Sequence, residues 1–279
     1  MKKKTVPFII LAIFHAILFS YTFNKNRQNT LAILFTSIGI AYVFEYFVLN
    51  IFKMYTYYPR VYKNRWIDSV FGALLSQSLF VPIVGTSLVI FNLGWRWRIG
   101  VSLFYGLVER LFIRWQIFRN NGWKTGLTVT SMPFYFYIVD KWWREIENGN
   151  ETKKNVLLFF FYWINYTNAL YFSLALLHKY FFRIGFLKDR YWEHFILVPI
   201  YTLITAVIAT MSTLVNEKIK PFGLLILHLF DQLLFKLKII QPSRKEYLYM
   251  LIPVHIFNLW LGKLYFRLLK KIHNQATTD

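Results

Sequence analysis

Residues 30–51 read TLAILFTSIGIAYVFEYFVLNI, an apolar run in which Glu45 is the single charged side chain. A helix needs about 20 mostly apolar residues to cross the hydrocarbon core of a bilayer, where it satisfies its own backbone hydrogen bonds. Eight further stretches share this character. The nine predicted spans cover residues 7–23, 30–51, 67–93, 95–118, 125–142, 156–180, 191–214, 221–240 and 247–269. The chain is therefore predicted to be an all-α, polytopic transmembrane helical bundle with about nine spans.

The composition agrees with a bilayer and excludes several classes of protein. Of 279 residues, 56% are hydrophobic and 16% are charged, against roughly 25% charged in a soluble domain. Lys and Arg number 33 and Asp and Glu 13, so the formal net charge is +20. Short basic loops suit anionic headgroups, whereas a nucleic-acid binder needs a solvated basic patch on a soluble fold. The absence of cysteine excludes disulfides, thiolate metal sites and a Cys nucleophile.

The basic residues also predict an orientation. Lys2, Lys3 and Lys4 resemble the start of a signal peptide, but no small-residue cleavage site follows, so we expect a retained anchor helix. With the N-terminus in the cytoplasm, 19 cations fall in cytoplasmic loops and 14 on the other side. Cytoplasmic loops are enriched in Lys and Arg, so this count predicts the N-terminus inside and the C-terminus outside.

Aligning the chain with itself at an offset near 120 residues predicts a tandem repeat. The segment 80–83 (FVPI) corresponds to 197–200 (LVPI), Pro133 to Pro253, Glu109 with Arg114 to Asp231 with Lys236, and Glu45 to Asn168. The predicted organisation is one membrane domain with three parts. These are an N-terminal anchor helix at residues 1–29, a first four-helix unit at 30–152 and a second four-helix unit at 153–279.

Three acids lie several residues inside predicted spans: Glu45, Glu109 and Asp231. Acids at such depth are costly, and so they are candidates for function. Each could take up a proton or cation, contact a headgroup, or fix helix packing by an ion pair or hydrogen bond. Glu109 and Asp231 each precede a base by five residues, which turns the acid and its own base to different helix faces. A cationic partner is therefore expected on a neighbouring helix.

A second group of polar residues lies in the C-terminal half. His228 and Asp231 share a helix face, His255 occupies the next span, and Glu193 precedes His194. Imidazole and carboxylate both suit zinc and both titrate, so a metal site or a proton relay is conceivable. No His-Glu-x-x-His motif is present, and adjacent residues on a helix point in different directions. We therefore expect no metal, no cofactor and no catalytic residue.

Part of the chain resembles a known family. The residues concerned are Glu45-Tyr46, Tyr58-Pro59-Arg60-Val61, Asp68, Pro82, and the segments 107–112 (LVERLF) and 122–125 (GWKT), on to Trp142. Over about residues 40–145 this pattern is similar to a family of uncharacterised small integral-membrane proteins of spore-forming bacilli and clostridia, generally with about five spans. The resemblance implies a bacterial cytoplasmic membrane and a sporulation or germination context, and it supplies no catalytic residue.

Three functions remain open from the sequence. The leading interpretation is a multi-spanning membrane protein without covalent catalysis, which acts as a structural or partner-binding component of an envelope or sporulation process. The first alternative is a small cation- or proton-coupled carrier that uses Glu45, Glu109 and Asp231. The second is a membrane-embedded lipid-modifying enzyme that uses His228, Asp231, His255 and Glu193. The expected partners are a bilayer with anionic headgroups and a membrane protein or second copy, with no nucleic acid.

Overall fold

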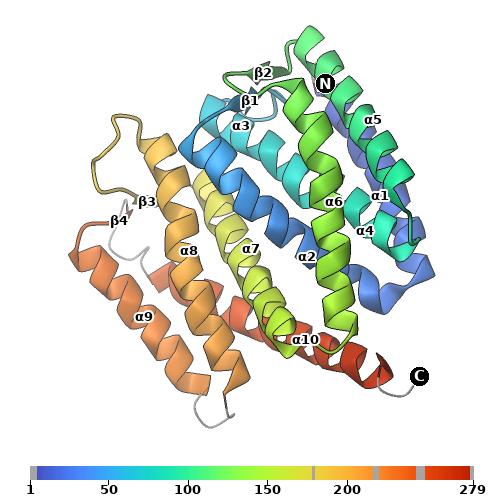
Figure 1. The fold of residues 1–279 in the computed structure, drawn as a ribbon. Helices are drawn as coiled ribbons and strands as arrows, with labels where there is room; N and C mark the ends of the chain where they lie inside the picture. The colour runs from blue at the N-terminus through green and yellow to red at the C-terminus, as the bar shows by residue number, and fades with distance from the viewer. Residues whose placement is uncertain (1–4, 178–179, 216–219, 243–248, 277–279) are drawn as a thin grey trace. The chain divides into compact units, whose positions relative to one another are not determined.

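The computed structural model describes residues 5–177, 180–215, 220–242 and 249–276, so Lys2, Lys3 and Lys4 lie outside the described residues. The chain divides into two compact units, Met1–Asn150 and Glu151–Asp279, which we call unit 1 and unit 2 and describe separately. Helices make up most of both units (Figure 1). The prediction of an all-α fold is confirmed.

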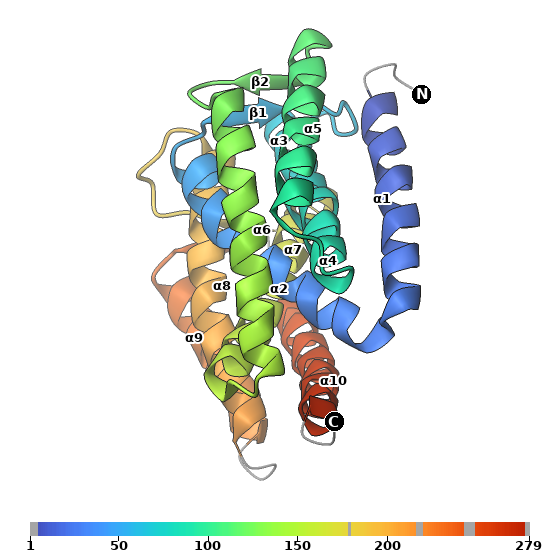
Figure 2. The same cartoon turned by 45° about the vertical axis from the view of Figure 1, so that its right-hand side comes forward.

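The described part of unit 1 contains five helical segments along the chain, two of them with π-helical parts. In order, its elements are α1 (Val6–Lys25), α2 (Arg27–Glu45) continued by the π-helix η1 (Tyr46–Ile51), β1 (Tyr55–Tyr57), α3 (Arg65–Leu74), the π-helix η2 (Leu75–Phe80), α4 (Val81–Ile90), α5 (Trp95–Arg114), β2 (Phe118–Asn120) and α6 (Thr125–Glu147). Helices α3, η2 and α4 form one continuous helix. Figure 2 shows α1 at the edge of the unit, where it packs on α4 and α2.

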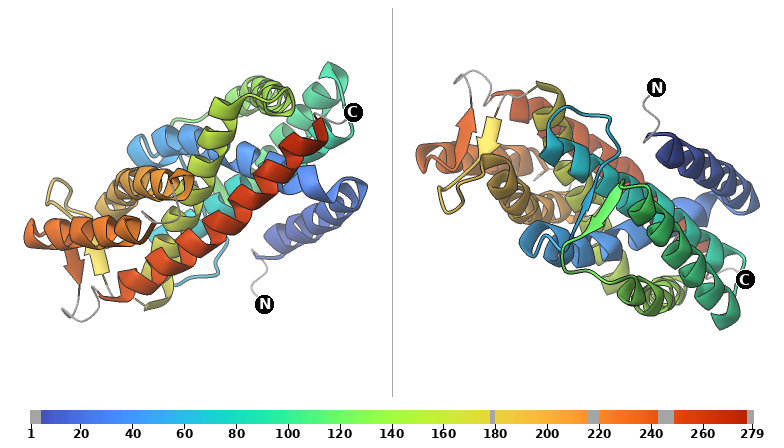
Figure 3. Two further views of the ribbon diagram at one scale, coloured as in Figure 1. Left: turned by 90° about the horizontal axis from the view of Figure 1, so that it is seen from below. Right: turned by 90° about the horizontal axis from the view of Figure 1, so that it is seen from above.

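Unit 2 has a simpler sequence of elements. They are α7 (Glu151–Leu177), β3 (Tyr180–Phe182), α8 (Arg190–Leu214), α9 (Lys220–Lys236), β4 (Ile240–Pro242) and α10 (Leu251–Ala276). Helix α8 packs on α7 and α9, and α10 packs on all three of the others. Figure 3 shows the β3–β4 pair beside the ends of α8 and α9.

All nine predicted spans coincide with helices, but only some of these helices meet the requirements of a membrane span. Within the described residues, four are long and apolar enough to cross a bilayer: Val6–Lys25, Arg27–Ile51, Arg65–Ile90 and Arg190–Leu214. Helix α1 also exposes a row of apolar side chains, including Ile10, Ile13 and Ile17. Such a row fits a hydrocarbon surrounding better than water. Length and composition thus support four spanning helices, where the sequence predicts nine.

Each unit is closed at one end by a short antiparallel strand pair that the sequence does not predict. Tyr55 pairs with Asn120 in unit 1, and Tyr180 pairs with Pro242 in unit 2, each at the start of a three-residue ladder. The hydroxyl of Thr5 donates to the carbonyl oxygen of Pro59 at 2.9 Å, so α1 begins at the strand end of unit 1. The strands tie together helices that are distant in sequence.

A buried carboxylate holds the loop that follows β1. Asp68, the fourth residue of α3, accepts the backbone N–H groups of Arg60, Val61 and Tyr62 at 2.7–2.9 Å. Asn64 caps the same helix by accepting two backbone N–H groups of its first turn. The carboxylate of Asp68 therefore accepts backbone N–H groups that have no backbone acceptor in this loop.

Unit 2 has an equivalent contact between a carboxylate and a loop after β3. Glu193, the fourth residue of α8, accepts the N–H groups of Ile184, Gly185 and Phe186 at 2.7, 2.5 and 3.2 Å. Asp189 caps α8 in the way that Asn64 caps α3. Glu193, which the sequence predicts as a site residue, therefore has a structural role: it accepts hydrogen bonds from the loop before α8.

The helices that lead into the second strand of each unit also end alike. Gln116 after α5 and Lys238 after α9 both have left-handed backbone conformations, with φ of 55° and 58°. The following N–H groups, of Ile117 and Ile239, donate back to carbonyls five residues earlier at 3.0 and 2.9 Å. These two caps are 122 residues apart, as are Glu109 and Asp231.

The caps correct the predicted alignment of the prolines. Pro82 lies 18 residues after Asn64, whereas Pro199 lies 10 residues after Asp189. Pro82 is in the first turn of α4, and Pro199 is inside α8. The FVPI and LVPI segments are therefore not equivalent, because their similarity reflects composition and not position in the helix.

Candidate functional site

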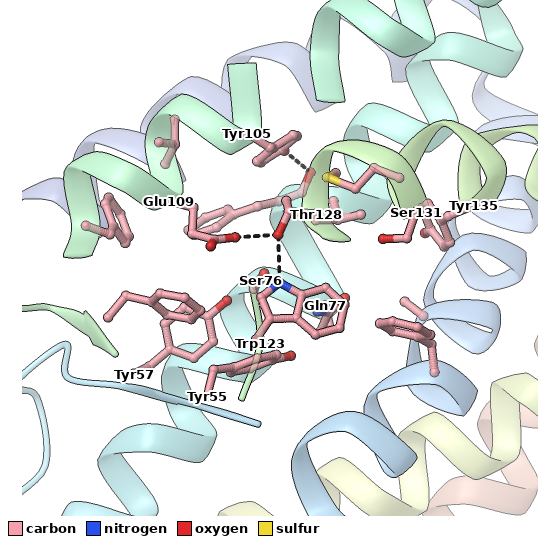
Figure 4. Close-up of a pocket in the computed structure, with 18 of the residues that line it drawn as sticks. Tyr55, Tyr57, Ser76, Gln77, Tyr105, Glu109, Trp123, Thr128, Ser131 and Tyr135 are labelled. Carbon is pink, nitrogen blue, oxygen red and sulfur yellow. Dashed lines mark hydrogen bonds between the residues drawn. The ribbon is translucent and has the colours of Figure 1, made fainter. Parts of the chain in front are cut away.

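Unit 1 contains a cavity of about 430 Å³ (Figure 4). Its walls come from α1, α2, η2, α5 and α6 and from the strand pair. The aromatic side chains that line it are Phe8, Phe44, Tyr55, Tyr57, Phe80, Tyr105, Phe112, Phe118, Trp123, Phe134 and Tyr135. Small-molecule sites are typically concave, mostly apolar and of 300–1,000 Å³, with a few polar groups. The cavity has the size and chemistry of such a site.

Glu109 of α5 is the acidic side chain on the cavity wall. One of its oxygens accepts the hydroxyl of Thr125 at 2.7 Å, and the other accepts the hydroxyl of Thr128. The indole N–H of Trp123 donates to the same Thr128 oxygen at 2.8 Å (Figure 4). Asn120 is a distant further donor at 3.5 Å. The partners of Glu109 are therefore neutral, not the cation expected from the five-residue spacing.

Glu45 lies behind the cavity wall, at the junction of α2 and η1. Its Oε2 atom accepts the hydroxyl of Tyr55 and the amide of Gln77, the latter at 3.1 Å. Both of these donors line the cavity. Its Oε1 atom is buried and has no hydrogen-bond partner among the described residues. A buried carboxyl oxygen without a partner is unusual and calls for a functional explanation.

The two acids approach the same part of the cavity. Burial raises the pKa of the Tyr57 hydroxyl far above its usual value, and Glu45 and Glu109 both raise it further. Tyr57 also hydrogen-bonds the side chain of Ser76. Tyr57 therefore stays protonated and keeps a hydroxyl group on the cavity wall.

Local backbone structure places the polar wall. Glu45 is the last residue before η1, and Ser76 and Gln77 belong to η2. A π-helical segment has one extra residue per turn, which turns side chains away from their regular α-helical positions, and such segments are frequent at functional sites. In unit 2 the corresponding helices α7 and α8 are α-helical over their whole described length.

The equivalent region of unit 2 contains a closed polar network. Asp231, which is fully buried, accepts the hydroxyl of Tyr201 at 2.6 Å and contacts Nε2 of His255 at 2.8 Å. Nδ1 of His255 lies 3.2 Å from the hydroxyl of Tyr166. All four side chains are buried. The structure thus brings together two of the predicted residues, Asp231 and His255.

The surroundings of Glu109 and Asp231 differ at one pair of equivalent positions, which is Ser76 in unit 1 and Tyr201 in unit 2. Ser76 lies 12 residues after the cap Asn64, and Tyr201 lies 12 residues after the cap Asp189. Ser76 borders the cavity of unit 1. Tyr201 instead packs its ring on Phe182, with centroids 4.7 Å apart, and directs its hydroxyl to Asp231.

The remaining predicted residues lie apart from this network. His228 is hydrogen-bonded at 3.3 Å to Gln232 on its own helix, and Glu193 is engaged by its loop and by Arg183 at 3.1 Å. Nδ1 of His194 accepts the backbone N–H of Phe182. Over the described residues no group of three His, Cys, Asp or Glu could hold a metal ion.

The sequence did not single out Tyr55, Tyr57, Ser76, Gln77, Thr125 or Thr128 as site residues. One signal was available: Tyr55 and Tyr57 alternate, as residues on one face of a strand do. A hydropathy window of 20 residues cannot detect a three-residue strand. No family model, curated protein or solved structure matches this chain.

Proposed function

We propose that this chain is a multi-spanning protein of the bacterial cytoplasmic membrane that binds a small amphiphilic molecule in the cavity of unit 1, without covalent catalysis. The observation that carries the proposal is the aromatic cavity of unit 1, with Glu109 on its wall and Glu45 directly behind the wall. Polar groups in a mainly apolar cavity orient a ligand and select it.

The membrane location rests on the four long apolar helices and on the exposed apolar side chains. Three residues that line the cavity, Phe44, Phe134 and Ile138, are themselves exposed. The cavity therefore reaches the surface beside α2 and α6, between side chains suited to lipid. An amphiphile would enter from the bilayer at this point. The sporulation or germination context rests on the family resemblance alone.

We infer that the two units arose by tandem duplication. The support is the shared order of elements, the equal strand registers, and the caps and loop carboxylates at matching positions. In unit 2 the equivalent of Glu109 is engaged by Tyr201 and His255. Binding would thus be retained in unit 1, while the network in unit 2 serves packing.

The two alternative functions from the sequence, the enzyme and the carrier, receive different support. The enzyme would use His228, Asp231, His255 and Glu193 as one cluster, but Glu193 and His228 bond elsewhere. The carrier would have acids that converge on one cavity. Glu109 lines the cavity of unit 1 and Glu45 bonds two residues of its wall, whereas Asp231 is buried in unit 2. A carrier is therefore the form of this binding function that the geometry favours.

A substitution that fills the cavity tests the proposal. Ser76→Tyr places in unit 1 the side chain found at the equivalent position of unit 2, and Ser131→Phe fills the cavity from α6. Both variants should reduce labelling of cavity peptides by an uncharged photoreactive phenylalkyl probe by about tenfold, because the ligand volume is lost. The measurement is crosslinking in nanodiscs followed by peptide mass spectrometry.

Ser76→Ala is the matched control, since it keeps the cavity open and should be labelled as the natural protein is. Thermal midpoints measured in parallel identify any variant that fails to fold. Undiminished labelling of cavity peptides in both folded filling variants would refute binding in this cavity.

A further inference from the structure

The cavity of unit 1 has an unbalanced charge. Among the described residues, no Lys, Arg or His lines it, and its ionisable side chains apart from tyrosines are Glu109 on the wall and Glu45 behind Tyr55 and Gln77. An anion that entered this cavity would meet two carboxyl groups and no compensating charge.

Glu109 has donors but no counter-ion. Thr125, Thr128 and Asn120 are neutral, and no ion pair to Glu109 exists in the part of the chain that the structure describes. These neutral donors leave the charge of a carboxylate uncompensated. In surroundings of low dielectric constant that charge attracts a cation strongly.

Glu45 adds a second, independent observation. The side chain is 7% exposed, and its Oε1 atom is buried without a hydrogen-bond partner. Its described partners, Tyr55 and Gln77, are neutral as well. A buried carboxyl oxygen without a partner is unusual, and the polar head of a ligand in the cavity would supply one.

The aromatic walls suit the same ligand. Tyr55, Tyr57 and Trp123 line the cavity together with Glu109 (Figure 4). A cation over the face of Trp or Tyr is attracted by the ring quadrupole, and aromatic cages recognise substituted ammonium groups in this way. The exposed apolar side chains of Phe44, Phe134 and Ile138 lie where the ligand leaves the cavity.

We propose that the ligand of unit 1 is an organic monocation with an apolar tail, and that the carboxyl groups of Glu109 and Glu45 select it. This inference rests on the proposed binding function and adds the charge of the ligand. The ammonium group lies among Tyr55, Tyr57 and Trp123, and the tail extends toward Phe134.

Three photoreactive probes of equal shape test the charge: a phenylbutyl trimethylammonium, its uncharged tert-butyl isostere, and a phenylbutyl sulfonate. The protein is held in nanodiscs of zwitterionic lipid, so that the bilayer does not concentrate the cation. The cation should label cavity peptides at concentrations about tenfold lower than the isostere, and the sulfonate should label them least, as expected for a desolvated charge pair.

Substitutions of Glu109 and Glu45 test whether these two acids cause the preference for the cationic probe. Glu109→Gln and Glu45→Gln should each reduce labelling by the cation about tenfold and leave labelling by the isostere unchanged. Glu109→Asp, which keeps the charge, should retain more of the preference than Glu109→Gln does. Glu147→Gln removes an exposed acid of α6 outside the cavity and should change nothing.

The outcomes separate the two proposals. Equal labelling by the three probes, or an unchanged preference for the cation in the folded Gln variants, overturns the inference about charge. If the isostere still labels the cavity and Ser76→Tyr blocks it, the binding function stands. Absence of cavity labelling by every probe overturns both.

Discussion

Glu109 and Asp231 occupy matching positions before their helix caps, yet their chemistry differs because of their neighbours. Glu109 is held by the hydroxyls of Thr125 and Thr128, which leave room for a ligand. Asp231 is held by Tyr201 and His255, which use its oxygens internally. A carboxyl group acquires its role from the donors around it, so position alone does not distinguish a binding acid from a packing acid.

The location of these acids could be predicted from their spacing to a base, but the nature of their partners could not. The spacing led to the expectation of a cation on a neighbouring helix, whereas Glu109 has neutral donors. Thr125 and Thr128 reach Glu109 only because β2 and the turn after it bring α6 beside α5. That contact depends on strand pairing, which hydropathy does not report.

The loop carboxylates give a prediction for single residues. Asp68→Asn and Glu193→Gln should each lower the free energy of unfolding by about 2 kcal/mol, because the amide has one acceptor oxygen and turns N–H donors toward backbone N–H groups. Unfolding is followed by denaturant titration in detergent. Asp189→Asn makes the same change at a helix cap, where Asn serves as well as Asp, and should be nearly neutral. An equal loss in all three variants would contradict this account.

The long apolar runs explain why the helices could be predicted and the strands could not. A helix forms its hydrogen bonds within the run itself, so a pattern of 20 residues indicates it. The strands β1 and β2 have three residues each and find their partners about 60 residues away. The π-helical segments η1 and η2 are likewise not indicated by the hydropathy of the runs that contain them.

The helix caps give a prediction at this scale. Lys238 has a left-handed conformation with φ of 58°, which costs a residue with a side chain about 1–2 kcal/mol. Lys238→Gly should therefore stabilise the protein by up to about 1 kcal/mol after the entropy of glycine is counted. Lys238→Ala removes the same charge without relieving the conformation and should give no gain. A thermal shift that is equal for both variants would rule out relief of the backbone as the cause.

The charged residues that the structure describes in unit 1 are unevenly distributed between the two ends of the unit. The strand end carries eight cations, Lys53, Arg60, Lys63, Arg65, Arg110, Arg114, Arg119 and Lys124, and its two acids, Asp68 and Glu109, point inward or into the wall. The opposite end has six cations and three acids. Because the N-terminal helix starts at the strand end, this asymmetry agrees with an N-terminus inside the cell.

Cysteine labelling checks that orientation, and the natural chain has no thiol to interfere. A Cys at position 63, in place of exposed Lys63, should react with a membrane-impermeant maleimide only after the cells are permeabilised. A Cys at position 148, in place of exposed Asn148 at the other end, should react in intact cells. The reverse pattern would place the strand end of unit 1 outside the cell.

The strand pairs also determine when each unit can be completed during synthesis. At 5–20 residues per second, a ribosome needs about 3–12 s to make the roughly 60 residues between β1 and β2. Until then the backbone groups of β1 have no strand to pair with. All the elements of unit 1 have been made when α6 ends, while most of unit 2 is still untranslated. Every molecule of this protein therefore passes through a stage in which the chain of unit 1 is whole and that of unit 2 is not.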